Sequence, residues 1–390
     1  MVETITYSAV DFVVAGLMLA VPTGIGIRYA VRDARRAATR EEYLMGGRHM
    51  AVLPVALSTF ITFVSAVSLM GTPAEMYFFG AVGYSIYMAM SLGHIIAAFT
   101  TAPLINPLKL TSVYEYLHLR YQSKGLQMFG TLIGMAQTMI YQAVVLLLPA
   151  LALQSCADLP LWISLFLFGA VGTVYTTIGG FKSVVWTDVF QAGVVFFGLL
   201  IIIIKGCIEV GGISQVWHLS GEGGRLNFDR LSFDPRTRHS QWGIFVGFTL
   251  LWYFNSFSQP TAQRISCLGN VRRARMCCLI NAPVSLLTGV LTCFTGLTAY
   301  AYYTLQRCDP LQAGLISNKN QLAPYFVLHA MADIRGFSGL FLGVISSGSL
   351  STLSSGKPYH FTFQHVTSST HNPFFHLVNF IISACRKHCI

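Results

Sequence analysis

Charged residues are scarce in this sequence. Asp, Glu, Lys and Arg make up 10% of its 390 residues, whereas a typical soluble domain contains about 25%. Hydrophobic residues make up 54%, and Phe alone contributes 28 residues. A water-soluble fold could not cover that much apolar material, and a disordered chain would be far more polar. The composition excludes both and predicts a polytopic protein of the lipid bilayer.

Cys-x-x-Cys pairs are lacking. The nine cysteines are odd in number and scattered, and with this composition they exclude a secreted disulfide scaffold. The net charge of +10 would suggest a nucleic-acid partner if the protein were soluble. Here the basic residues cluster between apolar segments, so they indicate membrane topology and no nucleic-acid binding.

Long segments without Asp, Glu, Lys or Arg predict the spanning helices, since a helix needs about 20 apolar residues to cross the hydrocarbon core. Nine such segments occur: 12–27, 49–74, 76–108, 125–157, 159–181, 189–204, 239–263, 276–306 and 336–356. The first, third, fifth and seventh linkers between them hold 14 Lys and Arg residues. By the positive-inside rule these linkers lie in the cytoplasm, and the N-terminus lies outside.

Two predicted spans are rich in hydroxyl groups and glycine. In the first, Ser58, Thr62 and Ser65 follow helical spacing, and residues 71–73 (Gly-Thr-Pro) are expected to interrupt the helix. The second carries seven hydroxyl groups within 346–355. Close helix packing would explain one such span. A sodium site would explain both, because hard cations prefer oxygen ligands and broken helices in transporters supply carbonyl oxygens. The sequence leaves both interpretations open.

Acidic residues within the apolar segments are few. Asp188 lies at the predicted cytoplasmic start of a span. It is either a functional intramembrane acid or a helix-start acid that complements the helix dipole. An enzyme would need a nucleophile–base pair, a metal cluster or paired carboxylates. The predicted spans show none of these, and the lone His94 is expected to be a core residue, so no enzyme is expected. A channel is the remaining alternative to a carrier.

Four motifs are specific in combination. They are SAVSLMGTPAEMYFFG (65–80), YTTIGGFKSVVWTDVFQ (175–191), TAQRISCLGNVRRAR (261–275) and GLFLGVISSGSLSTLSSG (339–356). Together they resemble the sodium/solute symporter family, and the resemblance covers residues 5–356. The first motif resembles the branch that includes the monocarboxylate, iodide and multivitamin carriers.

This resemblance implies an all-α polytopic membrane protein of the leucine-transporter type, an inverted repeat of five helices each that follows one extra helix. The extra helix would be 9–29. The first repeat would use 51–79, 82–104, 125–153, 160–178 and 184–206, and the second would begin with 240–262, 275–303 and 324–356. Residues 1–356 would thus form one symporter domain of about nine helices.

The resemblance also implies a sodium site and no other cofactor. Its ligands in the family are carbonyls of the first core helix, with a carbonyl and hydroxyls of the eighth. Carried over by position, they are the carbonyls of Phe60, Phe63 and Gly348 and the hydroxyls of Ser351 and Thr352.

The substrate is expected beside that ion, between 51–79 and 240–262. The expected lining residues are Ser65, Ser68, Thr72, Trp252 and Asn255. For Trp252, an aromatic residue of the membrane interface is the alternative. No Arg or Lys lies within the cores of the spans, so an anion would depend on helix N-termini, hydroxyls and the co-bound sodium ion.

The predicted function is a sodium-coupled secondary symporter that takes up a small, monocarboxylate-like organic anion by alternating access. Its expected partners are Na⁺, that anion and the lipid bilayer, and its expected location is the plasma membrane. Residues 357–390 resemble nothing in the family and are expected to form a divergent, poorly ordered tail. The second repeat would then be incomplete. The alternative function is therefore a transport-incompetent, C-terminally truncated isoform of such a carrier.

Overall fold

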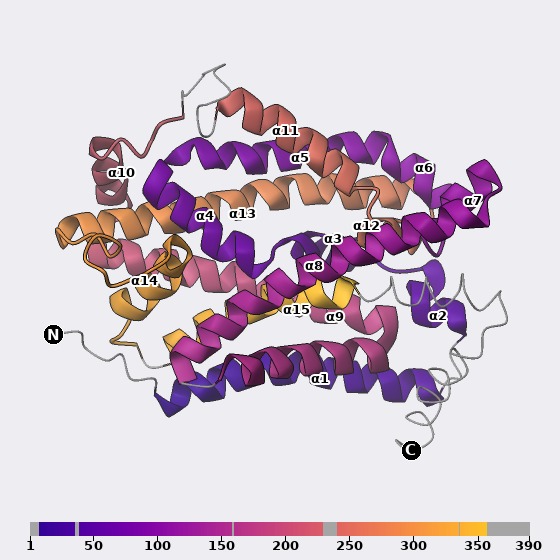
Figure 1. Cartoon of the computed structure of the whole chain (residues 1–390), viewed down its shortest axis with the longest axis horizontal. Helices are drawn as coiled ribbons and strands as arrows, with labels where there is room; N and C mark the ends of the chain where they lie inside the picture. Colours follow the sequence, from indigo (N-terminus) through magenta and orange to yellow (C-terminus); the bar gives the residue numbers. More distant parts are fainter. Residues whose placement is uncertain (1–7, 36–38, 158–159, 229–239, 335, 357–390) are drawn as a thin grey trace.

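Helices make up all the regular structure of the described part of the chain. The computed structural model describes residues 8–35, 39–157, 160–228, 240–334 and 336–356, and no strand occurs in these ranges (Figure 1). The predicted tail, 357–390, lies outside the described residues.

The described helices follow one another along the chain, and the longest connections lie between α10 and α11 and between α13 and η3. Their bounds are α1 (Ala9–Arg35), α2 (Arg40–Met45), η1 (Gly46–Arg48), α3 (Val52–Phe63), α4 (Ala66–Phe79), η2 (Ala81–Tyr84), α5 (Ser85–Phe99), α6 (Thr101–Leu108), α7 (Glu115–Tyr121), α8 (Lys124–Ala157), α9 (Leu161–Val210), α10 (Ile213–Glu222), α11 (Gln241–Asn255), α12 (Gln259–Ser266), α13 (Val271–Leu305), η3 (Lys319–Gln321), α14 (Leu322–Ala330) and α15 (Phe337–Gly356).

All nine apolar segments fall on helices. Within the described residues, six helices are long and apolar enough to cross a membrane: Ala9–Arg32, Ala81–Phe99, Lys124–Gln154, Gly179–Val210, Val271–Leu305 and Phe337–Gly356. The predicted segments 49–74 and 239–263 are each divided into two shorter helices. Conversely, α9 contains two predicted segments, joined at a kink at Gly180 where φ is +64°.

The first core helix breaks between α3 and α4, earlier than predicted. Val64 and Ser65 leave the helical conformation, whereas α4 continues through residues 71–73. The prediction of a break at 71–73 is therefore wrong. A proline such as Pro73 is tolerated inside a membrane helix because neighbouring groups satisfy the freed backbone. The break is instead fixed by a contact with α15, described below.

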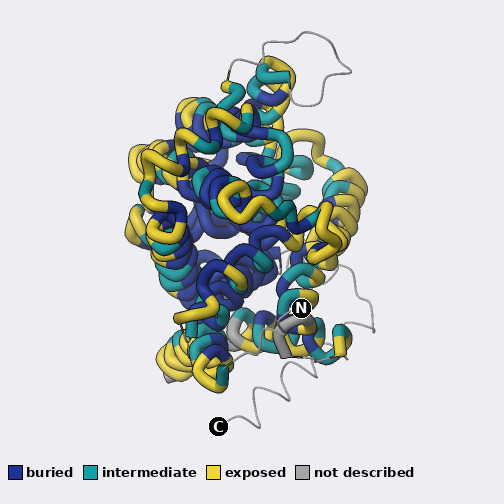
Figure 2. Tube along the Cα trace, turned by 90° about the vertical axis from the view of Figure 1, so that its left-hand side faces the viewer, coloured by how far each residue is buried: buried dark blue, intermediate teal, exposed yellow. Residues whose placement is uncertain are grey.

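The hydroxyl-rich helix α15 is buried, whereas the apolar helix α8 is peripheral. In the most apolar part of α15, 89% of the residues are buried, against 22% in α8. Figure 2 shows the same division, with buried segments in the middle and exposed ones around them. Apolar side chains on the outside and polar ones inside are what a lipid environment favours.

Helix α15 packs mainly against α1, α8, α9 and the α3–α4 pair. Its N-terminal end is held by α1, where Asp11 Oδ1 accepts a hydrogen bond of 3.1 Å from the Gly339 N–H. A carboxylate at that position satisfies a free amide and complements the helix dipole. These contacts fix the position of α15 along its axis relative to α3 and α4.

Candidate functional site

The break between α3 and α4 frees main-chain carbonyls inside the molecule. The Val64 N–H bonds to the Ile61 carbonyl at 3.2 Å, so the Phe60 carbonyl loses its usual helical partner. Phe63 is the last residue of α3, and the residues after it do not continue the helix. Carbonyls freed at such a break are the oxygens that transporters offer to a coupling cation.

Helix α15 meets the broken helix at this point. A Cβ on Gly348 would lie 2.8 Å from the Val64 carbonyl oxygen, so only glycine allows the approach. Four residues later, the Thr352 hydroxyl donates to the Thr62 carbonyl at 2.9 Å and to the Gly348 carbonyl at 3.1 Å. The structure thus brings the two hydroxyl-rich segments together, and this contact fixes the position of the break.

The two predicted hydroxyl ligands have their protons engaged elsewhere. Ser351 donates to Asp188 Oδ1 at 2.7 Å, and Thr352 donates to carbonyls as described. A hydroxyl that donates its only proton offers its lone pairs to other groups. The oxygens of Ser351 and Thr352 are therefore oriented as acceptors, which is the arrangement that a cation needs.

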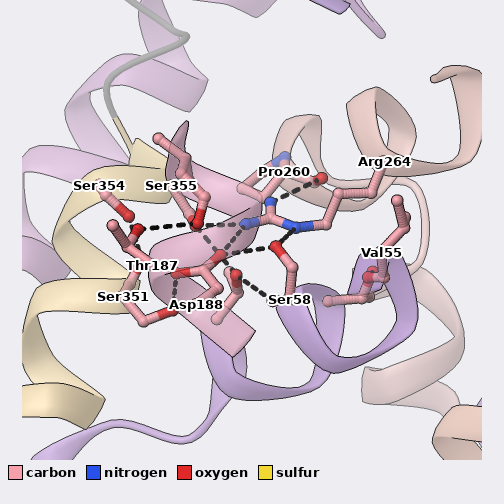
Figure 3. A network of polar contacts seen from close by, with 12 residues as sticks. Val55, Ser58, Thr187, Asp188, Pro260, Arg264, Ser351, Ser354 and Ser355 are labelled. Carbon is pink, nitrogen blue, oxygen red and sulfur yellow. Dashed lines mark hydrogen bonds and ion pairs between the residues drawn. The ribbon is translucent and has the colours of Figure 1, made fainter. Parts of the chain in front are cut away.

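A buried ion pair lies directly beside Ser351 (Figure 3). Arg264 Nη2 lies 2.9 Å from Asp188 Oδ2, and the side chains are 2% and 0% exposed. The Ser58 hydroxyl donates to the same carboxylate oxygen at 2.6 Å and accepts from Arg264 Nε at 2.8 Å. Ser355 accepts from Arg264 Nη2 at 2.8 Å. The network joins α3, α9, α12 and α15.

Extensive hydrogen bonding makes this burial tolerable. Moving two charges out of water costs several kcal/mol each, and the attraction offsets that cost only when the remaining polar atoms are satisfied. Both carboxylate oxygens of Asp188 accept hydrogen bonds, and Arg264 also donates to the Pro260 carbonyl at 3.2 Å. The pair is neutral, so a bound cation would supply the net charge of the site.

The position of Asp188 decides between its two interpretations. It lies about two turns beyond the Gly180 kink, in the interior of α9, so it does not start a helix. Its contacts connect it to Ser351, one of the predicted sodium ligands. The structure therefore favours the interpretation of Asp188 as a functional intramembrane acid.

A cavity of about 600 Å³ adjoins the break. This volume is within the range of about 300–1,000 Å³ typical of small-molecule sites. All five predicted lining residues contact it: Ser65, Ser68, Thr72, Trp252 and Asn255. Of the predicted sodium ligands, Phe60, Phe63 and Thr352 also line it, so these three residues lie next to the expected substrate site.

Trp252 lies inside the molecule. It is half-buried, its ring meets Phe63 edge to face with a centroid distance of 5.4 Å, and it stacks on His94 at 6.2 Å. His94 itself is buried, and its Nδ1 lies 2.9 Å from the Met90 carbonyl, as expected for a core residue. The position of Trp252 fits the lining role better than that of an interface aromatic.

Two residues of this region were not predicted. The sequence around Arg264 indicates only a basic residue in a cytoplasmic linker. However, Arg264 directly follows an apolar segment, and the chain has an intramembrane Asp188. These two facts together are a signal that could have indicated a buried role for Arg264. Tyr87 lines the cavity and bonds to Thr72 at 2.9 Å. A tyrosine within an apolar segment looks like ordinary packing, so no signal pointed to it.

The family model of the "Sodium:solute symporter family" matches residues 43–357. The chain belongs to the sodium:solute symporter family. This is a family of symporters and not of enzymes, and together with the apolar helices it establishes an integral membrane protein.

Several relatives of this member of the sodium:solute symporter family carry transport names. The chain is 38% identical to the sodium-coupled monocarboxylate transporter 2 of Bos taurus, over 90% of this chain and 56% of that protein. It is 39% identical to the human sodium-coupled monocarboxylate transporter 1, over 90% and 57%. It is 38% identical to the human sodium/iodide cotransporter, over 90% and 54%. The chain thus spans a little over half the length of these relatives.

A solved structure confirms the predicted fold class. A Na⁺-coupled sialic acid symporter in a substrate-bound outward-open state superposes with a TM-score of 0.83 at 22% identity, over 94% of this chain and 76% of that one. This member of the sodium:solute symporter family therefore has the all-α, leucine-transporter-type fold that its motifs predict.

Proposed function

We propose that this chain is a sodium-coupled secondary symporter that takes up a small, monocarboxylate-like organic anion by alternating access across the plasma membrane. The observation that carries the proposal is the pair of neighbouring hydroxyls on α15 whose protons are engaged: Ser351 donates to Asp188 of α9, and Thr352 donates to the Thr62 carbonyl of the broken helix.

The sodium ion would bind to neutral oxygens. The ligands are the carbonyls of Phe60, Phe63 and Gly348 and the hydroxyls of Ser351 and Thr352. Because the Asp188–Arg264 pair is neutral, the ion brings one net positive charge into the membrane. Moving that charge through the full field gains roughly 2.3 kcal/mol per 100 mV, which is free energy available for uptake.

The anion would occupy the adjacent cavity. Among its described lining residues there is no Lys, Arg or His, and Glu75 is the one carboxylate. Hydroxyls, the indole of Trp252, the amide of Asn255 and the sodium ion itself are the groups that can stabilise an anion there. The names of the bovine and human relatives support a monocarboxylate.

Uptake of labelled propionate into cells that express the chain tests this proposal. Uptake should require sodium, and Ser351→Ala or Thr352→Ala should lower the apparent sodium affinity about tenfold, the equivalent of 1.4 kcal/mol. Ser354→Ala is the matched control, because its hydroxyl donates to the Ser351 carbonyl of its own helix. Equal uptake in choline medium would contradict sodium coupling.

The alternative, a transport-incompetent form of such a carrier, predicts the same sodium binding but no uptake. The purified chain would then melt at a higher temperature in sodium than in choline, Ser351→Ala would abolish this shift, and no propionate would be taken up. Measuring both the melting temperature and uptake therefore separates the two candidates.

A further inference from the structure

The hydroxyl of Thr72 is one of several around the cavity that donate to no main-chain carbonyl, together with those of Ser65, Tyr87, Tyr141, Ser258 and Ser355. Ser68, Ser285 and Thr352 donate to main-chain carbonyls, as do Thr62 and Thr138. Such bonds use the proton and leave none for a ligand. Among the described residues, Thr72 has one hydrogen-bond partner, the hydroxyl of Tyr87 at 2.9 Å. Both residues line the cavity.

Tyr87 is held in place by α13. A Cβ on Gly289 would overlap its ring, so glycine leaves the space that the ring fills. One turn further along α13, the Thr292 hydroxyl donates to the Tyr87 oxygen at 3.2 Å and shares its proton with the Thr288 carbonyl at 2.8 Å. Tyr87 is 7% exposed. Its hydroxyl therefore stands at a fixed point between α13 and Thr72.

The contact between Tyr87 and Thr72 can run in either direction, because either hydroxyl can be the donor. In one of the two directions, the Tyr87 oxygen accepts from Thr292 and the Tyr87 hydroxyl donates its own proton to Thr72 Oγ1. The proton of Thr72 is then free to point into the cavity. Chains of hydroxyls polarise one another, so the last donor is stronger than an isolated hydroxyl.

We propose that the hydroxyl chain Thr292–Tyr87–Thr72 is the anion-selective element of the cavity, with Thr72 donating to one carboxylate oxygen of a bound monocarboxylate. This inference rests on the proposed function, because it assigns a partner to the anion of that site. An anion beside Thr72 accepts and cannot donate, so its binding selects this direction of the chain. Tyr87 and Thr292 act as positioning residues.

Binding of labelled propionate to the purified chain at saturating sodium tests the proposal. Tyr87→Phe removes the link and Thr72→Val removes the donor, and each should weaken propionate binding about tenfold, or 1.4 kcal/mol. Thr72→Ser keeps the hydroxyl and should restore the affinity. Thr295→Val is the matched control on α13, since its hydroxyl donates to the Leu291 carbonyl at 2.9 Å, and should bind like the parent.

A second readout separates recognition from folding. Propionamide has nearly the same shape without the charge, so the parent should prefer propionate and Tyr87→Phe should lose most of that preference. The sodium-induced rise in melting temperature without propionate should be unchanged in all four variants. Propionate affinity in Tyr87→Phe equal to the parent's, with the sodium response intact, would overturn this inference alone. A parent without any sodium response would overturn the proposed function as well.

Discussion

The polar groups on the two sides of the α3–α4 break differ in how completely they are paired. On the α3 side, the charges of Asp188 and Arg264 are neutralised by each other and bonded to Ser58, Ser351 and Ser355. On the α4 side, the cavity is lined by hydroxyl, amide and aromatic groups. Breaking a buried, hydrogen-bonded ion pair costs much free energy, so the pair holds the helices that carry it together. Hydroxyl groups that can form a further hydrogen bond are able to bind a ligand.

Removing one charge on the α3 side should have the largest effect. Arg264→Ala leaves the Asp188 carboxylate buried without its positive partner, which costs about 3–5 kcal/mol. The variant should show a much lower melting temperature in detergent and reduced surface expression.

Lys205→Ala is the control for this prediction. Lys205 forms ion pairs with Glu209 and Asp333 at the molecular surface, where solvent screens them. Its loss should hardly change the melting temperature. If Arg264→Ala had the same melting temperature as Lys205→Ala, the buried ion pair would not stabilise the fold more than a surface ion pair does.

Closing the gap at the break should have an intermediate effect. Gly348→Ala places a methyl group 2.8 Å from the Val64 carbonyl, so α15 and the break must move apart, at about 1–3 kcal/mol. The sodium-induced rise in melting temperature should shrink because the ligands separate. Gly169→Ala, in a helical position with open space around it, should be neutral or slightly stabilising. Identical behaviour of the two variants would show that the approach is not tight.

A conservative change on the α4 side should have the smallest effect. The indole Nε1 of Trp252 is buried without a hydrogen-bond partner among the described residues, so Trp252→Phe removes an unpaired donor and keeps an aromatic edge against Phe63. The free energy of unfolding should change by less than about 1 kcal/mol. Trp252→Ala loses the ring and should cost at least about 2 kcal/mol. A large decrease in the free energy of unfolding of Trp252→Phe would indicate that the indole N–H makes a hydrogen bond that the structure does not show.

The positions of the helices could largely be predicted from the sequence. The run without charges at 125–157 corresponds to α8, and the hydroxyl-rich run at 336–356 is the buried helix α15. Both predictions rest on the transfer energy of side chains, which is a local property. The meeting of Gly348 with the broken helix was expected from the family motifs and not from periodicity.

The exact break and the partner of Asp188 could not be predicted. Local rules place a break at Gly71 and Pro73, yet the helix opens at Val64 because a carbonyl there faces Gly348 of a distant helix. Likewise, the position of Arg264 after an apolar segment is a signal of a buried role, but no residue near it in the chain identifies Asp188 as its partner. Both features depend on contacts between segments far apart in sequence, and these appear only in the folded molecule.

The kink in α9 has a mechanical consequence. Gly180 joins the first half of α9 to the half that carries Asp188. This single residue makes the connection, whereas most connections between helices are loops of several residues. Tyr43 of α2 clamps the same corner, since its hydroxyl donates to the Thr177 carbonyl at 2.6 Å. The two halves of α9 are therefore closely coupled at this kink. A tilt of the first half of α9 would shift the half that carries Asp188, and with it the contacts that Asp188 makes to Arg264 and Ser351.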